Sequence, residues 1–152
     1  MRLWRICRQP HAAGAFSGEG ARLYGGRWNS PGVSVVYTSP SLALAALETF
    51  VHLEPNLHPD DLVSIEAELP DDVASERLDL KSLPRNWYKL RDESLRGFGD
   101  RWTRATEAVA LQVPSAAIRG EWNVLLNPAH SDFLRIKIEH PKPFAFDLRM
   151  FP

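Results

Sequence analysis

Two segments of the sequence alternate strictly between apolar and polar residues, and this period of two limits the possible folds more than any other feature. Within residues 62–69 the alternating apolar positions are Val63, Ile65, Ala67 and Leu69, and within residues 134–139 they are Leu134, Ile136 and Ile138. Successive side chains of a strand point to opposite faces of its sheet. We therefore predict two half-buried strands, each with one face in the core.

The rest of the chain predicts further strands and only two helices. Further strands are predicted over residues 3–7, 33–38, 109–113, 123–126 and 144–148. Ser41 is placed to cap a helix over residues 42–51, and a second helix is predicted over residues 92–106. The glycine-rich residues 9–28 predict a long irregular loop, which in a compact domain is usually functional. Because strands outnumber helices and do not alternate regularly with them, we predict one α+β domain over residues 1–152.

Composition excludes several classes of protein. A hydrophobic fraction of 44% in 152 residues is enough for one continuous core. A net charge of −1 disfavours nucleic acid as the main ligand. The sequence has no apolar signal region and no apolar run long enough to span a membrane, so we expect a cytoplasmic protein. With scattered histidines and one cysteine, Cys7, which we expect to be buried and inert, no metal site is expected.

Glu48 is the only charged residue between Val33 and Val51. It belongs to a predicted helix that is apolar on nearly every face, so we expect the carboxylate to be buried. Burial costs several kcal/mol unless the carboxylate is paired or hydrogen-bonded. Glu48 is therefore either a structural residue, in an ion pair with an arginine or at a solvated edge, or a catalytic carboxylate on the floor of a cleft.

A second candidate segment is Gly25-Gly26-Arg27-Trp28-Asn29. Two glycines allow the backbone to approach a ligand closely, and the Arg27 guanidinium can hold a phosphate through two parallel hydrogen bonds. Trp28 can line a ring pocket, although tryptophan is more often part of the core. The segment lacks the lysine of a P-loop and the remainder of a dinucleotide fingerprint.

Four blocks of sequence together closely resemble the RES domain. They are SGEGARLYGGRWN (17–29), VYTS (36–39), LALAALE (42–48) and EWNVLLNPAHSDF (121–133). The resemblance runs in the right order over almost the whole chain. It implies a fold similar to that of ADP-ribosyltransferase toxins of the diphtheria type, with small split β-sheets and flanking helices around an NAD cleft.

The resemblance also implies a function and a partner. RES domains are toxins of bacterial type II toxin–antitoxin pairs that deplete NAD by hydrolysis or phosphorolysis, or modify a protein by ADP-ribosylation. NAD is then the substrate, and no metal is needed. The implied partner is an antitoxin with an Xre-like DNA-binding half that blocks the cleft, so no direct contact with nucleic acid is expected.

The family's arginine, tyrosine and glutamate fall on Arg27, Tyr37 and Glu48, and its nucleotide-contacting serine on Ser115. Each part of NAD, namely the nicotinamide leaving group, the phosphates and the ribose, requires a different kind of side chain. Cleavage of the nicotinamide–ribose bond builds positive charge at the ribose, which a fixed Glu48 would stabilise. Arg27, together with Arg5 from the first strand, would grip the pyrophosphate. Tyr37 would stack on the nicotinamide, and Tyr24 or Trp28 is the alternative ring for this role.

Three readings of the function stay open. The first is NAD cleavage with water or phosphate as the acceptor. The second is ADP-ribosyl transfer to a protein, which would share every site residue. The third is an inert module that only binds the antitoxin, against which the intact Arg27, Tyr37 and Glu48 argue. Asn123, Asn127 and His130 are expected to shape a turn rather than contact ligand.

Overall fold

The first sheet is built on a long antiparallel pair of strands, β1 (Arg2–Arg8) and β3 (Leu62–Glu68). The computed structural model describes residues 1–90 and 93–151. β7 (Lys137–Ile138) and β8 (Lys142–Pro143) pair antiparallel with β3. The alternation predicted for residues 62–69 is confirmed, because Val63, Ile65, Ala67 and Leu69 are at most 3% exposed.

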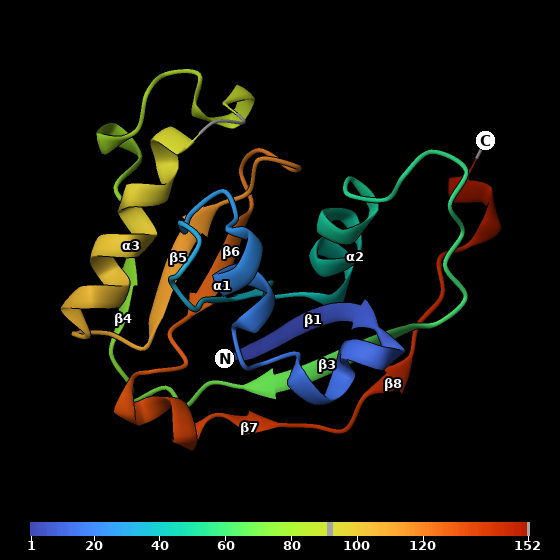
Figure 1. Cartoon of the computed structure of the whole chain (residues 1–152), viewed down its shortest axis with the longest axis horizontal. Helices are drawn as coiled ribbons and strands as arrows, with labels where there is room; N and C mark the ends of the chain where they lie inside the picture. The colour runs from blue at the N-terminus through green and yellow to red at the C-terminus, as the bar shows by residue number, and fades with distance from the viewer. Residues whose placement is uncertain (91–92, 152) are drawn as a thin grey trace.

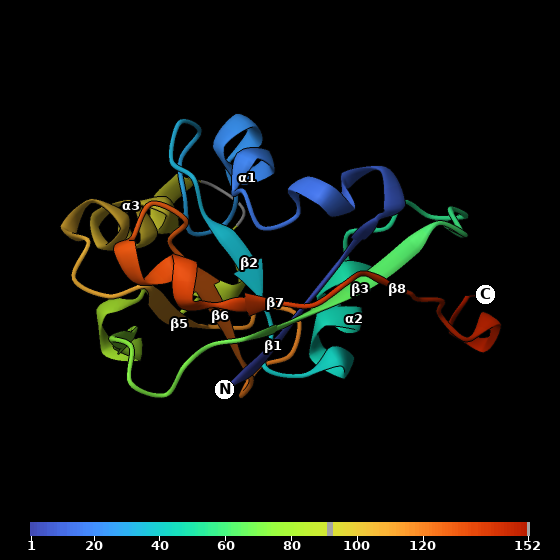
Figure 2. The ribbon, with the colours of Figure 1, turned by 90° about the horizontal axis from the view of Figure 1, so that it is seen from below.

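The second sheet has the strand order β2 (Val36–Thr38), β6 (Trp122–Leu126), β5 (Ala110–Pro114) and β4 (Ser75–Arg77). Its pairs are antiparallel except β4 with β5, which is parallel. An isolated bridge between Trp4 and Ser39 links the two sheets, so the end of β2 lies against β1. Figure 2 shows the sheets meeting where β1 passes beneath β2.

Each sheet has its own helix. α2 (Leu42–Phe50) packs against β1, and α3 (Arg96–Ala105) lies beside β4 and β5 (Figure 1). The predicted cap is confirmed, because the Ser41 hydroxyl accepts a hydrogen bond of 3.1 Å from the backbone N–H of Leu44. A third, short helix, α1 (Glu19–Tyr24), precedes the glycine pair.

Two apolar clusters correspond to these layers. One lies between the sheets and includes Leu3, Ile65, Val36 and Leu126. The other lies under α3 and includes Trp28, Leu95, Trp102, Val113 and Leu125. Six 3-10 turns complete the described chain: Gln9–Gly14, Leu80–Ser82, Trp87–Lys89, Glu93–Leu95, Ser131–Arg135 and Leu148–Met150.

The α+β class is confirmed, but several predicted elements are wrong in extent or type. The loop over residues 9–28 contains a 3-10 turn and α1. The strand over residues 134–139 is reduced to Lys137–Ile138 because the preceding residues form a 3-10 turn, in which Leu134 is 90% exposed. Residues 144–148 form no strand; Phe146 packs against both Phe144 and Phe50.

Three other elements are shorter than predicted. Of residues 33–38 only Val36–Thr38 pair in a sheet, and the helix over residues 42–51 ends at Phe50. The helix over residues 92–106 begins at Arg96, and Asp92 lies outside the described residues. Glycines at positions 97 and 99 do not interrupt it.

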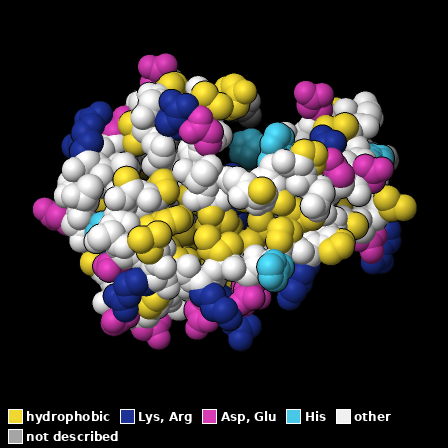
Figure 3. Space-filling view, turned by 60° about the horizontal axis from the view of Figure 1, so that its bottom comes forward, with side chains coloured by type: hydrophobic (Ala, Val, Ile, Leu, Met, Phe, Trp, Pro, Cys, Tyr) yellow, Lys and Arg dark blue, Asp and Glu magenta, His cyan; other side chains and the backbone are white. Residues whose placement is uncertain are grey.

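Charged side chains of both signs lie on the face drawn in Figure 3. On the face in Figure 3, hydrophobic side chains gather across the middle while Lys, Arg, Asp and Glu side chains alternate around the edge. This face therefore carries no broad basic patch of the kind that binds a phosphate backbone. Among the described helices, none has the length and hydropathy needed to cross a membrane.

Candidate active site

Two adjoining cavities lie where the sheets and α2 meet. The first has a volume of about 630 Å³ and is lined by β1, α1, the glycine pair, β2, α2 and the end of β5. The second, of about 580 Å³, lies on the side of Tyr88 and Arg96. Both are lined by Gly26, Arg27, Glu48, His52 and Ala116. Arg27 and Glu48 therefore stand at the boundary between two halves of one cleft.

Glu48 is held by neutral hydrogen-bond donors. Its Oε1 accepts hydrogen bonds from the Ser115 hydroxyl, at 2.6 Å, and from the Asn123 side-chain amide. No ion pair joins Glu48 to a basic side chain within residues 1–90 and 93–151, so the ion-pair reading is not supported there. Glu48 is less buried than predicted, because α2 buries Leu44 and Ala45 while Glu48 is only partly buried. The carboxylate is thus oriented by hydrogen bonds at the boundary of the two cavities.

The two donors to Glu48 are themselves fixed. The Ser115 hydroxyl accepts a hydrogen bond of 2.9 Å from the Ile118 backbone N–H, and Ser115 is 1% exposed. The Asn123 Oδ1 accepts a hydrogen bond of 2.7 Å from the Ser39 hydroxyl. Glu48 is therefore positioned from the ends of three strands, β2, β5 and β6.

The glycine pair allows the loop that carries Arg27 to lie directly against Tyr37. A Cβ added at Gly26 would stand 2.5 Å from the Tyr37 hydroxyl oxygen, so no side chain fits there. Gly25 has a φ of +69°, which favours glycine. The Tyr37 hydroxyl accepts a hydrogen bond from the Trp28 N–H at 3.1 Å and donates one to the Asn29 Oδ1 at 2.7 Å. Burial raises the pKa of Tyr37, so its hydroxyl remains a donor.

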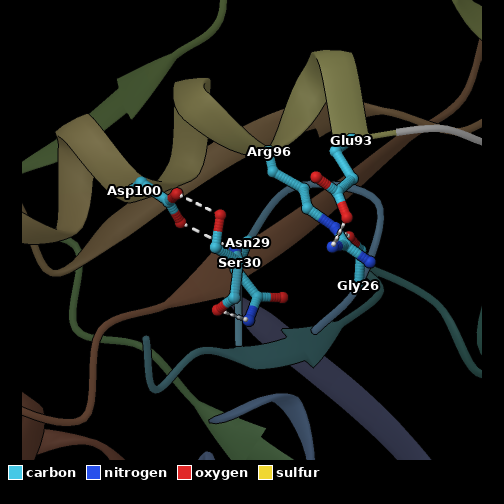
Figure 4. Close-up of polar contacts among 6 residues, drawn as sticks. All are labelled: Gly26, Asn29, Ser30, Glu93, Arg96 and Asp100. Carbon is cyan, nitrogen blue, oxygen red and sulfur yellow. Dashed lines mark hydrogen bonds and ion pairs between the residues drawn. The ribbon is translucent and has the colours of Figure 1, made fainter. Parts of the chain in front are cut away.

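Helix α3 holds the same loop from the other side (Figure 4). The Asp100 carboxylate accepts hydrogen bonds from the Ser30 N–H at 2.9 Å and the Ser30 hydroxyl at 2.6 Å. Arg96 donates to the Gly26 carbonyl at 3.1 Å and pairs with Glu93. The loop is therefore preorganised, which a substrate-positioning segment requires.

Asn29 completes the loop from inside. It is fully buried, and its amide nitrogen donates to the carbonyl oxygens of Ala21, Ser30 and Val33. Its Oδ1 accepts the hydrogen bond from the Tyr37 hydroxyl. The three bonds from its amide nitrogen hold the surrounding backbone turns together. Asn29 is a structural residue of the cleft.

The two arginines predicted for the pyrophosphate both line the first cavity. Arg27 Nη1 donates to the carbonyl oxygens of Leu90, at 2.7 Å, and Trp87, at 3.3 Å, across the cleft. Arg5 Nη1 donates to the Tyr37 carbonyl at 2.9 Å, while its Nε is buried with no hydrogen-bond partner in the described part of the chain. Burial lowers the pKa of Arg5. Arg5 therefore lines the cavity and carries a buried Nε–H with no hydrogen-bond partner among the described residues.

The remaining predicted residues lie around the same cavity. Tyr24 is 80% exposed at the end of α1, on the rim. Trp28 is 3% exposed and packs against Trp87 and Phe98, with ring centroids 6.0 Å and 6.5 Å apart, so it serves the core as well as the cavity wall. Cys7 is only half-buried and lines the cavity, against the expectation of a buried thiol, and burial raises its pKa.

Sequence reasoning missed the role of Asn123, which was assigned to a turn and instead donates to Glu48. Its position in β6, opposite Val113 of β5, brings it beside the end of β5 that carries Ser115. Asn127 and His130 do shape a turn: the Asn127 Oδ1 accepts from the Ala129 N–H and the His130 Nδ1 from the Asp132 N–H. Within the described residues, no cluster of three metal-ligating side chains is found.

Comparison with known proteins finds relatives that match nearly the whole chain. A Sphingobium protein named "Prs ADP-ribosylating toxin" is 38% identical over 97% of this chain and 94% of its own length. Proteins named "Toxin Res" from Yersinia enterocolitica and Pseudomonas putida are 35% and 36% identical, each over 99% of this chain and at least 99% of their own length.

A solved structure shares the fold at low sequence identity. The Mycobacterium tuberculosis MbcT–MbcA toxin–antitoxin complex contains a chain that matches with a TM-score of 0.68 and 17% identity, over 95% of this chain and 84% of that one. The family model for the RES domain matches residues 2–147. The chain therefore belongs to the RES domain family.

Proposed function

We propose that this protein is the toxin of a toxin–antitoxin pair and that it depletes NAD by cleaving the bond between nicotinamide and ribose. The observation that carries the proposal is the Glu48 carboxylate, held through Oε1 by Ser115 and Asn123 at the boundary of two cavities. A fixed negative charge at that place is what an oxocarbenium-like transition state requires.

The first cavity supplies the other needs of the reaction. We assign the pyrophosphate to Arg5 and Arg27, because Arg5 presents an unpartnered buried N–H and both side chains line the cavity. We assign the nicotinamide to the Tyr37 ring, with Trp28 and Tyr24 beside it. In this assignment Ser115 acts by holding Glu48, and the hydrogen bond from Asn123 does the same.

Catalysis then comes from Glu48. Its second carboxylate oxygen is left to accept a hydrogen bond from a ribose hydroxyl while positive charge grows at the anomeric carbon. Two opposite unit charges about 4 Å apart at an effective dielectric constant of about 20 attract by roughly 4 kcal/mol. That energy is available only in the transition state, so it raises the rate rather than the affinity.

Transfer of ADP-ribose to a protein is the second candidate. It is favoured by the relative named as an ADP-ribosylating toxin, which matches nearly the whole chain. The two activities use the same cleft and differ in the acceptor. An inert antitoxin-binding module is a third candidate, which the ordered carboxylate at the cleft disfavours.

The deciding experiment is incubation of the purified protein with NAD in three reaction mixtures. Free nicotinamide with ADP-ribose in phosphate-free buffer supports hydrolysis, and a phosphorylated ADP-ribose in phosphate buffer supports phosphorolysis. Label transferred from NAD to a protein of a cell extract supports ADP-ribosylation. No nicotinamide in any mixture would refute NAD cleavage.

We further propose that the partner is an Xre-like antitoxin that covers the cleft, and that the pair acts in the cytoplasm, where NAD is available. Support comes from the solved neighbour, which is a toxin–antitoxin complex. Hydrogen exchange should slow over residues 18–28 in the complex. Slowing restricted to a surface remote from Arg27 would contradict direct occlusion.

A further inference from the structure

The second cavity has no role in the assignment of NAD to the first. It is lined by Tyr88, Leu90 and Arg96 together with residues that also line the first cavity. A substrate that reacts at the boundary needs its acceptor to arrive from the side that the leaving group and phosphates do not fill. The second cavity is that side, and it shares Glu48 with the first.

His52 lines both cavities and follows Glu48 by four residues. Its backbone N–H donates to the Thr49 carbonyl, so the chain is still turning where α2 ends. Residues four apart on a helical turn lie on the same face, about 6 Å apart along the axis. Glu48 and His52 line the same two cavities, and His52 is the more exposed of the two.

The His52 imidazole forms no hydrogen bond or ion pair with the part of the chain that the structure describes. The other ionisable groups that line the second cavity are Arg27, Arg96, Tyr88 and Glu48. A guanidinium group has no free lone pair to accept a proton, and a phenol hydroxyl is a much weaker base than an imidazole. Glu48 has Oε1 occupied by two donors and its other oxygen assigned to the ribose. His52 is the group left to accept a proton from an acceptor.

We propose that the second cavity admits water as the acceptor and that His52 is the general base that deprotonates it. This inference rests on the proposed NAD cleavage. The water oxygen forms a bond to the anomeric carbon of the ribose. The carbon–nitrogen bond breaks with its electron pair moving to the nicotinamide nitrogen, and the water proton passes to an imidazole nitrogen of His52.

The resulting imidazolium has favourable and unfavourable neighbours. The C-terminal end of α2 and the Glu48 carboxylate stabilise a positive charge, while Arg27 and Arg96 across the cavity oppose it. The proton is then released to solvent, because His52 is exposed. No further group is needed to complete the cycle.

The test is His52→Gln, with His140→Gln as the matched control at an exposed histidine outside both cavities. In phosphate-free buffer, nicotinamide release by His52→Gln should fall by about 10²- to 10⁴-fold, the usual contribution of a general base. NAD affinity and melting temperature should match the wild type. Azide attacks without losing a proton, so adding it should restore nicotinamide release by the variant and yield an ADP-ribosyl azide.

The possible results distinguish the role of His52 from the proposed NAD cleavage. Hydrolysis by His52→Gln within a few-fold of the wild type would overturn the role of His52 and leave NAD cleavage standing. A variant that binds NAD but responds to neither water nor azide would also overturn it, because His52 would then act on the glycosidic bond. Failure of the wild type to release nicotinamide under either condition would overturn the proposed function itself.

Discussion

Replacing Glu48 with glutamine separates the catalytic reading of this residue from the structural one. The amide is nearly the same size as the carboxylate and neutral. Its oxygen can take the place of Oε1 and keep both hydrogen bonds, from Ser115 and Asn123, while its nitrogen faces the cleft. We therefore expect Glu48→Gln to fold and to bind NAD.

The magnitudes follow from those two contacts. A hydrogen bond to a charged group contributes about 1.5–3 kcal/mol to stability, and a bond between neutral groups contributes about 1 kcal/mol. Replacing the carboxylate by an amide weakens two such bonds, so the free energy of unfolding should fall by roughly 1–4 kcal/mol. Release of the partly buried charge from its desolvation penalty offsets part of that loss. The transition state, by contrast, loses the stabilising charge completely. That loss should raise the activation barrier by about 2.7–4 kcal/mol and lower the rate a hundred- to a thousandfold.

Nicotinamide release, NAD titration calorimetry and the melting temperature should be measured on one sample of Glu48→Gln. We expect turnover to fall at least a hundredfold, NAD affinity to be nearly unchanged, and the melting temperature to drop by a few degrees at most. A variant that melts many degrees lower yet turns over at the parental rate would refute the catalytic role.

Three further substitutions test the cleft. Arg27→Lys keeps the charge but loses the planar fork, so NAD affinity should fall by about 1.5–3 kcal/mol in titration calorimetry, and parental affinity would exclude a phosphate clamp. Tyr37→Phe keeps the ring but strands the Trp28 N–H and Asn29 Oδ1, which should cost about 2 kcal/mol and lower the melting temperature by roughly 4–8 °C; an unchanged melting curve would contradict this. In Gly99→Ala the new Cβ would stand 2.0 Å from the Trp28 carbonyl oxygen, so stability should fall by about 1–3 kcal/mol or more in denaturant unfolding. The control is Gly20→Ala, with no atom within 4 Å of its Cβ and an expected gain of about 0.5–1 kcal/mol; equal effects of the two would refute the packing argument.

The parts of the fold that could be predicted are those in which one local rule acts alone. The period of two located β3 because one face of that strand is buried along its whole length. Ser41 marked the start of α2 because a side-chain cap is a local contact. The same alternation misled at residues 134–139, where turn contacts from the His130 Nδ1 and the Phe133 carbonyl replace the strand pairing.

Other elements left no such local signal. α1 has no side-chain cap and no buried residue, so neither periodicity nor capping indicated it. Phe144 and Phe146 resemble strand residues by composition, but their partners are other aromatic rings, including Phe50 in α2. Contacts with residues far along the chain determine the structure of these segments, and local composition does not show those contacts.

For the site, sequence could identify side chains but not their partners. Glu48 was visible as one charge in an apolar helix, and Arg27 by its glycine pair. That Asn123 and Ser115 hold Glu48 depends on the pairing of β5 with β6, far along the chain. Likewise, the contacts of Arg27 with the carbonyl oxygens of Trp87 and Leu90 join segments about sixty residues apart.

The wide separation of the cleft residues along the chain has a consequence during translation. Arg5 and Glu48 emerge from the ribosome early, but the donors that orient the carboxylate, Ser115 and Asn123, are synthesised much later. At roughly 5–20 residues per second, several seconds pass between them. A nascent chain therefore carries the carboxylate without its orientation, and the cleft can complete only after β6 has paired with β5. Under the proposed function, the host has that interval in which an antitoxin can meet the chain before the cleft can act on NAD.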